Sequence, residues 1–562
     1  MGTLETQLAA GDRLHIWLKG VGEAEAEPSV ALFCGEAPVA TLRTMPSDDF
    51  LRAIYQADRD GTFRLVWEDA ATVVSLAYAF DPGNVHESGV KLLWTSEQNR
   101  APNRCYRLHF QAPWGWMNDP NGICEIEGFV HLFYQHYPHA RRWNTMHWGH
   151  AASRDMVTWV HQPIFLLPRE ELTRDKHKQG GAFSGSGVPM PDGTLRVFYT
   201  DREDNRKPDW EWQMTAVSTD VIAAGPSEAV LTERPPIPGY RRDFRDPYVL
   251  RGPDGRFKML IGGNDRQDAL ILLYETDDAT AAHGWRFVDV VYREPLRSGH
   301  TAECPCLVPL DGEGEGLWAL IYGLVGWREA ETGRRNISFA ITGTFDGRIF
   351  APIARRELDF GTDCYAFQAF QTKDGPYGIG WAANWTDVFK EQDFVTAMTF
   401  ARKLVWRSGT LLTPPCPALT RLRTHSTPRE LRSSSDPLPL KDGLAELGIT
   451  FVRSGVPFAL NFAHSTIGIT LAYDRGTLEL LYRPPPSKRP EPRYRLEDVD
   501  LTRLHIFVDV GLVEIFVDDG KWCATKRIDS DEPISAVHLE TEKALLACAD
   551  LWDLAPLAAA AG

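Results

Sequence analysis

The chain has 562 residues, 43% of them hydrophobic, and a formal net charge of −16. A chain this long suggests two or three domains with apolar cores, and its negative charge argues against nucleic acid and anionic membrane surfaces as partners. No apolar run reaches the length of a membrane span. Residues 1–7 lack the basic and apolar regions of a signal peptide, and nine scattered cysteines fit reduced thiols. We therefore expect a cytoplasmic protein.

Residues 1–100 form the first expected unit. Hydrophobic and polar residues alternate in short stretches such as 13–18 and 62–67, with Gly, Pro and Asp between them. Alternation of this kind is typical of strands that are buried on one face. We predict a small β-rich module here, joined to the next unit by the polar segment 96–103. The sequence assigns this module no chemistry.

Residues 101–413 form the second unit, in which short aromatic stretches recur with turn signals, a pattern that suits a β-propeller. Near its start, residues 116–122 read Trp-Met-Asn-Asp-Pro-Asn-Gly, and the stretches 105–110 and 128–135 on either side read as strands. Asp-Pro-Asn-Gly favours a turn. We therefore predict that Asp119 sits in a tight turn at a strand end and faces a pocket. A solvated Asp in a hairpin is the alternative for this motif alone.

Two further carboxylates, Asp246 and Glu303, occupy equally distinct motifs, Arg-Asp-Pro-Tyr and Ala-Glu-Cys-Pro. Glycoside hydrolysis needs one carboxylate as nucleophile or base and one protonated carboxyl as acid. Arg245 should keep Asp246 ionised, because a nearby cation lowers the pKa of a carboxyl, whereas apolar neighbours should favour neutral Glu303. Taken singly, the alternatives are a surface ion pair for Asp246 and an ordinary strand-end carboxylate for Glu303.

Seven motifs of the chain resemble, in order, those of glycoside hydrolase family 32, the fructosidase family that includes invertases, exo-inulinases and levanases. The resemblance covers residues 106–407, with a looser match to the C-terminus. One such motif is a weak signal, but seven in the family's order make coincidence implausible. The motifs occupy residues 116–122, 131–135, 146–150, 183–186, 245–247, 303–304 and 359–366.

The resemblance implies a role for each carboxylate. Asp119 attacks the anomeric carbon, Asp246 holds fructose hydroxyls and stabilises the transition state, and Glu303 is the acid/base. It also implies a set of substrate-binding residues, with Trp114 expected in the pocket wall beside them. The substrate-binding set is Trp116, Asn118, Gln135, Trp143, Trp148, Phe183, Ser184, Arg245, Tyr365 and Trp385.

The chain departs from the family pattern at three places. Residues 381–385 read Trp-Ala-Ala-Asn-Trp, residues 401–404 read Ala-Arg-Lys-Leu, and Cys364 stands where Phe is usual. We expect the first two segments near the pocket rim or in packing. They therefore put the leaving-group preference in doubt and leave the chemistry unchanged.

The third and fourth units follow residue 413. Residues 414–440 are rich in Pro, Ser and Arg and are predicted to be a linker between domains. Residues 441–562 again alternate, as in 504–509 and 513–517, and we predict a β-sandwich, which the family carries at this place. The expected fold is all-β, and the resemblance implies a five-bladed β-propeller for residues 101–413.

Two polar clusters have a plainer explanation than a binding site. Four histidines within residues 136–150 could be drawn as a metal site, but the segment 146–150 is itself a family signature without metal. We therefore expect no metal and no cofactor. Residues 176–178, Lys-His-Lys, could bind a phosphorylated sugar, although a solvated loop is the better interpretation.

We predict a retaining β-fructofuranosidase that hydrolyses terminal non-reducing fructosyl units of sucrose and short fructo-oligosaccharides through a covalent intermediate, with a small neutral sugar as its partner. A fructosyltransferase shares every catalytic residue and differs only in the acceptor. An exo-levanase or inulinase is a further alternative. A sugar-binding protein without catalysis is disfavoured because all three carboxylates are present. The sequence leaves the oligomeric state open.

Overall fold

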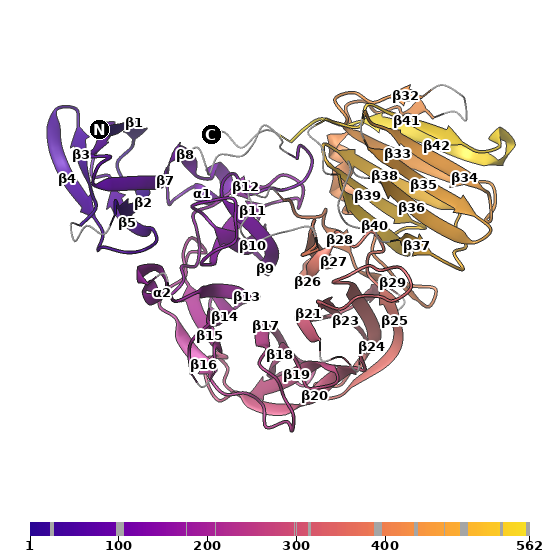
Figure 1. Ribbon diagram of the computed structural model, residues 1–562, viewed down its shortest axis with the longest axis horizontal. Coiled ribbons are helices and arrows are strands. Elements are labelled where there is room, and N and C mark those ends of the chain that lie inside the picture. Colours follow the sequence, from indigo (N-terminus) through magenta and orange to yellow (C-terminus); the bar gives the residue numbers. More distant parts are fainter. Residues whose placement is uncertain are drawn as a thin grey trace.

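The computed structural model describes residues 1–22, 27–96, 106–175, 177–207, 209–296, 298, 300–312, 316–386, 396–431, 437–465, 467–483, 493–528 and 532–557. Strands dominate this part of the chain, and its helices are short (Figure 1). The prediction of an all-β protein is therefore confirmed. Within the described residues, no helix combines the length and the apolar character needed to cross a membrane.

Two four-stranded antiparallel sheets form the N-terminal module. Their strand orders are β1-β6-β3-β4 and β5-β2-β7-β8. Apolar side chains such as Leu14, Leu32 and Phe63 come from both sheets and form a core that belongs to the module alone. The elements are β1 (Gly2–Leu8), β2 (Arg13–Gly20), β3 (Ser29–Cys34), β4 (Ala37–Arg43), β5 (Leu51–Gln56), β6 (Gly61–Trp67), β7 (Thr72–Phe80), α1 (Val85–Ser88) and β8 (Lys91–Thr95).

Five antiparallel sheets then follow one another around a common centre (Figure 1). The first sheet contains β9 (Trp116–Ile126), β10 (Phe129–Tyr137), β11 (His147–Ser153) and β12 (Val160–His161). The second contains β13 (Gly180–Pro189), β14 (Leu195–Glu203), β15 (Glu211–Ser218) and β16 (Glu228–Leu231). The third contains β17 (Phe244–Arg251), β18 (Phe257–Asn264), β19 (Ala269–Thr276) and β20 (Arg286–Glu294). The fourth contains β21 (Thr301–Pro309), β23 (Leu317–Val325), β24 (Ser338–Phe345) and β25 (Phe350–Glu357). The fifth contains β26 (Tyr365–Thr372), β27 (Gly375–Trp381) and β28 (Arg402–Lys403).

The first strand of each sheet lies innermost. Contacts run from β9 through β13, β17, β21 and β26 and back to β9, so the five inner strands surround one central space. Side chains tie neighbouring inner strands together: Gln368 accepts from Ile123 N at 2.9 Å and donates to Gly185 O at 2.8 Å. Ser186 donates to Pro247 O at 2.9 Å. These bonds fix the inner strands relative to one another.

All five inner strands carry an irregularity at the same level, where two of their residues oppose one residue of the next strand. The paired residues are 118–119 in β9, 183–184 in β13, 246–247 in β17, 304–305 in β21 and 366–367 in β26. A bulge of this kind bends the strand and redirects a side chain. The five bulges therefore turn selected side chains toward one end of the central space.

The predicted turn around Asp119 is corrected by this pattern. Asp119 lies inside β9 at the bulge, because Asp-Pro-Asn-Gly is accommodated as an interruption of strand pairing and not as a hairpin loop. Residues 106–110, predicted as a strand, form none and bend at 107–109, and residue 105 lies outside the described residues. The second predicted strand is present as β10.

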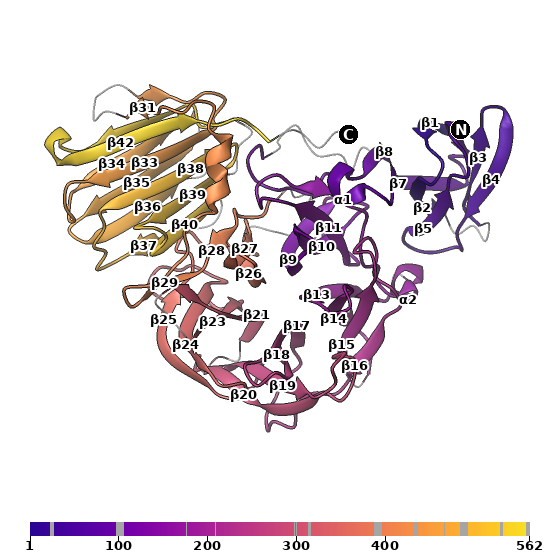
Figure 2. The same cartoon turned by 180° about the vertical axis from the view of Figure 1, so that it is seen from behind.

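Two six-stranded sheets form the C-terminal part, with the orders β31-β42-β33-β38-β39-β40 and β32-β41-β34-β35-β36-β37. Apolar side chains of both sheets share one core. Figure 2 shows the strands of these two sheets from behind. The first sheet contains β31 (Arg429–Glu430), β33 (Ala445–Phe451), β38 (Arg503–Asp509), β39 (Leu512–Val517), β40 (Trp522–Arg527) and β42 (Leu546–Asp553). The second contains β32 (Leu438–Pro439), β34 (Phe458–Ala463), β35 (Gly468–Asp474), β36 (Thr477–Arg483), β37 (Tyr494–Leu496) and β41 (Ala536–Glu540).

The segment 414–440, predicted to be a linker, contributes the short edge strands β31 and β32 to these two sheets. A small three-stranded sheet precedes it. The remaining elements are α2 (Glu170–Arg174), β22 (Asp311–Gly312), β29 (Val405–Arg407), β30 (Thr410–Leu412), η2 (Pro417–Leu422) and η3 (Lys543–Leu545).

Buried charged groups join the ring of sheets to the C-terminal part. Arg402 of β28 is wholly buried and pairs with Asp359 at 3.0 Å and with Glu514 at 2.8 Å. His109 lies between Asp509 at 2.7 Å and Glu514 at 3.1 Å. Because these charges neutralise one another across the contact, the C-terminal sheets are anchored to the ring.

Candidate active site

A cavity of about 690 Å³ opens at the end of the central space toward which the bulges turn their side chains. It receives residues from four of the five inner strands, from the second strands β10, β14 and β23, and from loops beside them. Its lining consists of Asn118, Asp119, Gln135, Arg142, Trp143, Asn144, Gln179, Phe183, Ser184, Arg202, Asp204, Arg245, Asp246, Glu303, Val325 and Trp385.

Asp119 is held by neutral donors on both carboxylate oxygens. Asn118 donates to Oδ1 at 3.0 Å, and Ser184 donates to Oδ2 at 2.7 Å. Asn118 is itself fixed, because the indole of Trp116 donates to its side-chain oxygen at 2.6 Å. Burial raises the pKa of Asp119 above its ordinary value, and the charge of Glu303 adds to this, although the two hydrogen bonds oppose it.

Asp246 is the most buried of the three carboxylates, with 6% of its surface exposed, and its backbone has a positive φ of 64°. Few residues other than Gly adopt this conformation without support. Here Thr200 accepts from Asp246 N at 3.0 Å, and Cys304 N donates to the carboxylate at 2.9 Å. Burial and the nearby charge of Glu303 raise the pKa of Asp246 to about 8.

This pKa corrects the prediction that Arg245 keeps Asp246 ionised. Burial and Glu303 raise the pKa of Asp246 more than Arg245 lowers it. The Arg245 guanidinium donates to Glu303 Oε1 from Nε at 3.1 Å and from Nη2 at 2.9 Å. It also pairs with Asp243 at 2.7 Å and Glu211 at 3.1 Å. Neighbours in sequence thus bind different partners, because Asp246 lies in the bulge and Arg245 precedes it, and a bulge redirects the side chains that it contains.

The surroundings of Glu303 also differ from the prediction. We expected apolar neighbours, but Tyr365 donates to Glu303 Oε2 at 2.8 Å while Arg245 occupies the other oxygen. The side chain of Glu303 is therefore held at both oxygens. Tyr365 is fully buried and belongs to β26, so the fifth sheet orients a carboxylate that the fourth sheet supplies.

The thiol of Cys304 lies between the other two carboxylates. Its sulfur is 3.7 Å from Asp119 Oδ2 and 3.6 Å from Asp246 Oδ2. Burial, with the charges of these neighbours, raises the pKa of Cys304 well above its ordinary value, so the group stays a neutral thiol. Three carboxylates from three inner strands thus meet within a small volume.

The cavity brings together ten of the thirteen residues that we expected at the site. The other three, Trp116, Trp148 and Tyr365, are fully buried one layer behind the lining. Trp148 packs in the core of the first two sheets and donates to Phe183 O at 3.0 Å. Trp114 is a core residue, against our expectation, and stacks on Tyr78 of the N-terminal module.

Six lining residues were not predicted: Arg142, Asn144, Gln179, Arg202, Asp204 and Val325. Arg142 and Asn144 flank the predicted Trp143, so their adjacency was a usable signal. The others lie outside the motifs, and no pattern in the sequence marks them. Arg202 and Val325 line the cavity from the second strands β14 and β23, Asp204 follows β14, and Gln179 precedes β13.

The histidines of residues 136–150 serve four different local contacts. His136 contacts Trp116 O at 2.7 Å, His139 contacts Ser75 at 2.8 Å, His147 contacts Thr145 O at 2.9 Å, and His150 contacts His131 at 3.0 Å. Burial lowers the pKa of His147 to about 3. Across the described residues, no group of three or more His, Cys, Asp or Glu side chains is arranged to hold a metal ion.

The sequence of the chain matches two models of one family. The glycosyl hydrolases family 32 N-terminal domain matches residues 109–415, and the glycosyl hydrolases family 32 C terminal matches residues 425–553. The chain therefore belongs to glycoside hydrolase family 32 and is a glycosidase. The family that the motifs predicted is confirmed.

Similar proteins agree with this assignment. A sucrose-6-phosphate hydrolase of Escherichia coli is 32% identical, with 81% of this chain and 96% of that protein covered. A raffinose invertase of Escherichia coli is 30% identical with the same coverage. The solved structure of a family 32 glycoside hydrolase from Bifidobacterium adolescentis has a TM-score of 0.87 at 20% identity and covers 99% of this chain and 100% of its own. The N-terminal module thus has a structural counterpart in that protein.

Proposed function

We propose that this glycosidase is a retaining β-fructofuranosidase, which removes terminal non-reducing fructosyl units from sucrose and short fructo-oligosaccharides. The observation that carries the proposal is the meeting of Asp119, Asp246 and Glu303 at or beside the bulges of three inner strands that line one cavity. The retaining route needs a nucleophile and an acid/base, and a third carboxyl can hold the ring.

In the first step, an oxygen of Asp119 forms a bond to the anomeric carbon while the bond from that carbon to the leaving oxygen breaks. Glu303 gives its proton to the leaving oxygen, which keeps the electron pair of the broken bond. Positive charge on the fructosyl ring reaches its maximum between these events. Asn118 and Ser184, which donate to Asp119, fix the direction of its attack.

In the second step, Glu303 takes a proton from water, the water oxygen bonds to the anomeric carbon, and the ester bond to Asp119 breaks. Two inversions at one carbon give net retention, which requires the carboxyls of Asp119 and Glu303 to lie about 5–5.5 Å apart. Arg245 and Tyr365 hold Glu303 in one orientation through both steps. Asp246, at the most buried position, binds the hydroxyls of the fructosyl ring.

We infer that the five sheets are the blades of a β-propeller and that the two six-stranded sheets form a β-sandwich. The closed sequence of contacts among the inner strands supports the first, and the core shared by the two sheets supports the second. Gln368 and Ser186 bridge the inner strands next to the bulges. We take these bonds to close the central space at the inner end of the cavity, so that only the end of a sugar chain can enter. We therefore expect exo action.

One observation favours a second substrate, sucrose 6-phosphate. Arg142 is exposed where it lines the cavity and has no ion pair with another described residue, so it could meet a phosphate at the leaving group. The Escherichia coli relative is a sucrose-6-phosphate hydrolase by name. Against this, Asp204 lines the same cavity, and Lys178 of the Lys-His-Lys segment approaches Glu203 at 3.6 Å. We therefore rank the neutral sugar first.

A substrate panel tests the proposal. Sucrose, sucrose 6-phosphate, kestose, inulin and levan are incubated with the enzyme, and released fructose is measured at early times. We expect sucrose and kestose to have the higher kcat/KM and fructose to be the sole early fructosyl product. Asp119→Asn should be inactive on every substrate, because an amide cannot form the ester. Fructose transfer to sugar at high sucrose would instead indicate a fructosyltransferase.

The eight cysteines among the described residues are all free thiols. This supports a reducing compartment, and we propose the cytoplasm as the location of the enzyme.

A further inference from the structure

The N-terminal module touches the catalytic part of the chain through the loop of residues 44–50. Asp48 N and Asp49 N donate to the carbonyls of Arg174 and Thr173, at 3.4 and 2.9 Å, at the end of α2. The carboxylate of Asp49 accepts from the hydroxyl of Tyr137, with distances of 2.9 and 3.1 Å to its two oxygens. One loop of the module thus binds two separate segments of the catalytic part.

Both segments lead directly into the wall of the active-site cavity. Tyr137 ends β10, and the residues that follow it include Arg142, Trp143 and Asn144 of the lining. Although burial and Asp49 raise the pKa of the Tyr137 hydroxyl more, Asn144 also interacts with that group and lowers its pKa. The helix α2 is followed, after a short connection, by Gln179 of the lining. The loop is therefore hydrogen-bonded to two segments that continue along the chain into the cavity wall.

A second contact from the module holds the same segment. Ser75 of β7 lies 2.8 Å from the ring nitrogen Nδ1 of His139, which is two residues beyond Tyr137. The ring of Phe50 lies 4.7 Å from that of His139. Two elements of the module, the loop and β7, thus fix the start of the wall segment.

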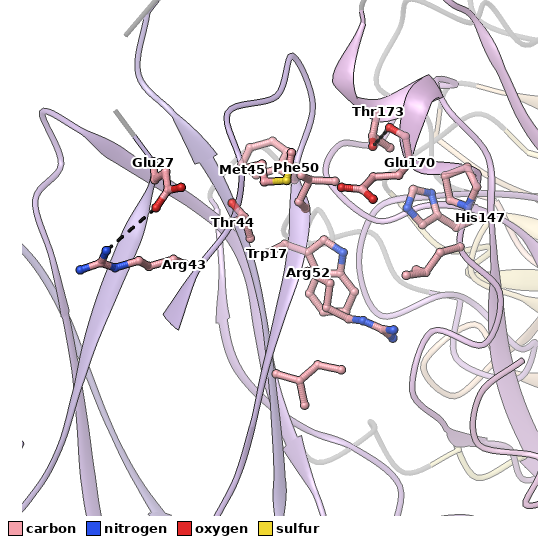
Figure 3. A pocket seen from close by; sticks show the side chains of 14 residues that line it. Trp17, Glu27, Arg43, Thr44, Met45, Phe50, Arg52, His147, Glu170 and Thr173 are labelled. Carbon is pink, nitrogen blue, oxygen red and sulfur yellow. Dashed lines mark hydrogen bonds and ion pairs between the residues drawn. The ribbon is translucent and has the colours of Figure 1, made fainter. Parts of the chain in front are cut away.

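Packing alone does not hold the loop. A cavity of about 500 Å³ lies beside it, lined by Trp17, Phe50 and Arg52 of the module and by His147 and Glu170 of the catalytic part (Figure 3). A hollow contact loses the dispersion energy that a filled one would provide. Burial raises the pKa of Asp49 above its ordinary value. The hydrogen bonds of Asp49 to Tyr137 and to the end of α2 therefore help to hold the loop in place.

We propose that the loop of residues 44–50 positions the cavity wall formed by Arg142, Trp143, Asn144 and Gln179, and so controls binding of the leaving group. Asp49 acts through Tyr137 and is a positioning residue. The wall residues Arg142, Asn144 and Gln179 are exposed near the mouth, whereas Asp246 is buried at depth. When the fructosyl unit lies at the carboxylates, the leaving group contacts the wall. This placement of the fructosyl unit at depth and of the leaving group at the wall rests on the proposed function.

Three variants test the proposal. Tyr137→Phe removes the hydroxyl that links Asp49 to Asn144, and Asp49→Ala removes the other end of the link. Tyr78→Phe is the matched control, because its buried hydroxyl accepts from Ile164 N at 3.0 Å across the same contact between module and catalytic part. Ile164 does not belong to the cavity lining. The control therefore weakens attachment of the module without touching the wall.

The first measurement is hydrogen exchange of the intact protein, followed by mass spectrometry. We expect faster exchange in peptides covering residues 138–146 in Tyr137→Phe and Asp49→Ala, and exchange as in the wild type for these peptides in Tyr78→Phe. Unchanged exchange in both test variants, or the same increase in all three, would overturn the proposal. This result does not depend on activity, so it decides the positioning role even if the proposed substrate is wrong.

The second measurement is kinetic. With sucrose, both test variants should raise KM by about three- to tenfold, the loss expected for one hydrogen bond that holds a binding group, while kcat changes less than about twofold. The inhibition constant of free fructose should stay as in the wild type, because fructose occupies the carboxylate end. The double variant should show no further rise in KM, since both residues belong to one link. Additive rises, or equal weakening of fructose and sucrose, would contradict control of the leaving-group side.

Discussion

At the scale of single residues, the three carboxyls of the site differ in their hydrogen-bond partners. Asp119 has two neutral donors, Glu303 has a guanidinium and a phenol, and Asp246 has a backbone N–H in the most buried position. Environments that differ in this way can give carboxyls different roles in one reaction. The division of labour between Glu303 and Asp246 is therefore open to direct test.

Glu303→Gln should impair sucrose far more than an activated aryl fructoside, because only the poor leaving group needs a proton at the departing oxygen. We expect a loss in kcat/KM of at least about 10²-fold on sucrose and a much smaller loss on the aryl substrate. Asp246→Asn should damage both substrates alike, since its proposed role is to hold the fructosyl ring. Equal losses of Glu303→Gln on the two substrates would remove its role as acid.

The pH dependence of stability should have opposite signs for two neighbouring aspartates. The pKa of Asp246 is raised to about 8 by burial and by Glu303, so its ionisation costs stability progressively as the pH rises from about 4 to about 8. Although burial opposes it, Arg245 lowers the pKa of Asp243, so its ionised form stabilises the fold above about pH 4, and this stabilisation is lost as the pH falls below that value.

Calorimetry between pH 4 and pH 9 checks these signs. The Tm of Asp246→Asn should rise relative to the wild type as the pH approaches 8 and then stay level, while Asp243→Asn should lower Tm throughout the neutral range. A shift of Tm in the same direction for both variants at pH 8 would show that the two charges do not differ as described.

At the scale of the element, the inner strands place the chemistry. Their bulges leave Asp246 and Cys304 at positive φ, with values of 64° and 48°, and turn them toward the cavity. Strands tolerate such interruptions where neighbouring elements supply the missing bonds. Thr200 does so for Asp246. The second strand of the second sheet, β14, thus takes part in building the site.

Gly323 of β23 shows this dependence. It lies opposite Glu303, and a methyl group there would come within 2.6 Å of the Tyr365 ring and 3.0 Å of its hydroxyl. Gly323→Ala should therefore displace Tyr365 from Glu303 and lower kcat/KM by about 10-fold or more. It should also destabilise the fold by about 1–3 kcal/mol through overpacking.

Tyr365→Phe is the control for Gly323→Ala, because it removes the same hydrogen bond without crowding the core. It should reproduce the kinetic loss with a smaller change in Tm. Wild-type kinetics in Gly323→Ala would mean that the bond between Tyr365 and Glu303 has no part in catalysis.

Much of the element structure is readable in the sequence, because alternation at residues 13–18 and 513–517 predicted strands that are present as β2 and β39. The expectation of one buried face was wrong for these two strands, which are buried on both faces because other elements cover each side. The order of the motifs identified the family and ten residues that now lie in one cavity. The bulge at Asp119 was not readable, since it depends on pairing with β10. Nor was the partner of Arg245, because Glu303 lies 58 residues away in sequence.

At the scale of the whole molecule, part of a family motif serves to join domains. In residues 359–366, Asp359 binds Arg402 and Thr525, and Asp363 binds Lys526, so the first half of the motif anchors the C-terminal sheets. The second half supplies Tyr365 to the site. The sequence alone cannot separate these roles, because the partners become visible only when the C-terminal part is docked.

Arg402→Leu tests this contact. It leaves Asp359 and Glu514 buried without their common cation, so we expect the free energy of unfolding to fall by about 3–5 kcal/mol. Arg59→Leu, which removes a fully exposed pair with Asp58, should leave unfolding unchanged. Denaturant unfolding measures both. Wild-type stability of Arg402→Leu would show that the buried charges do not hold the two parts together.

The most direct test of the central claim follows the anomeric form of fructose as it is released from sucrose, by proton NMR in the first minutes of reaction. If Asp119 forms a covalent intermediate and Glu303 acts as acid and then base, fructose must appear first as β-fructofuranose, and other forms must grow later by spontaneous equilibration. Release of α-fructofuranose first, or no release of fructose from sucrose at all, would contradict the account.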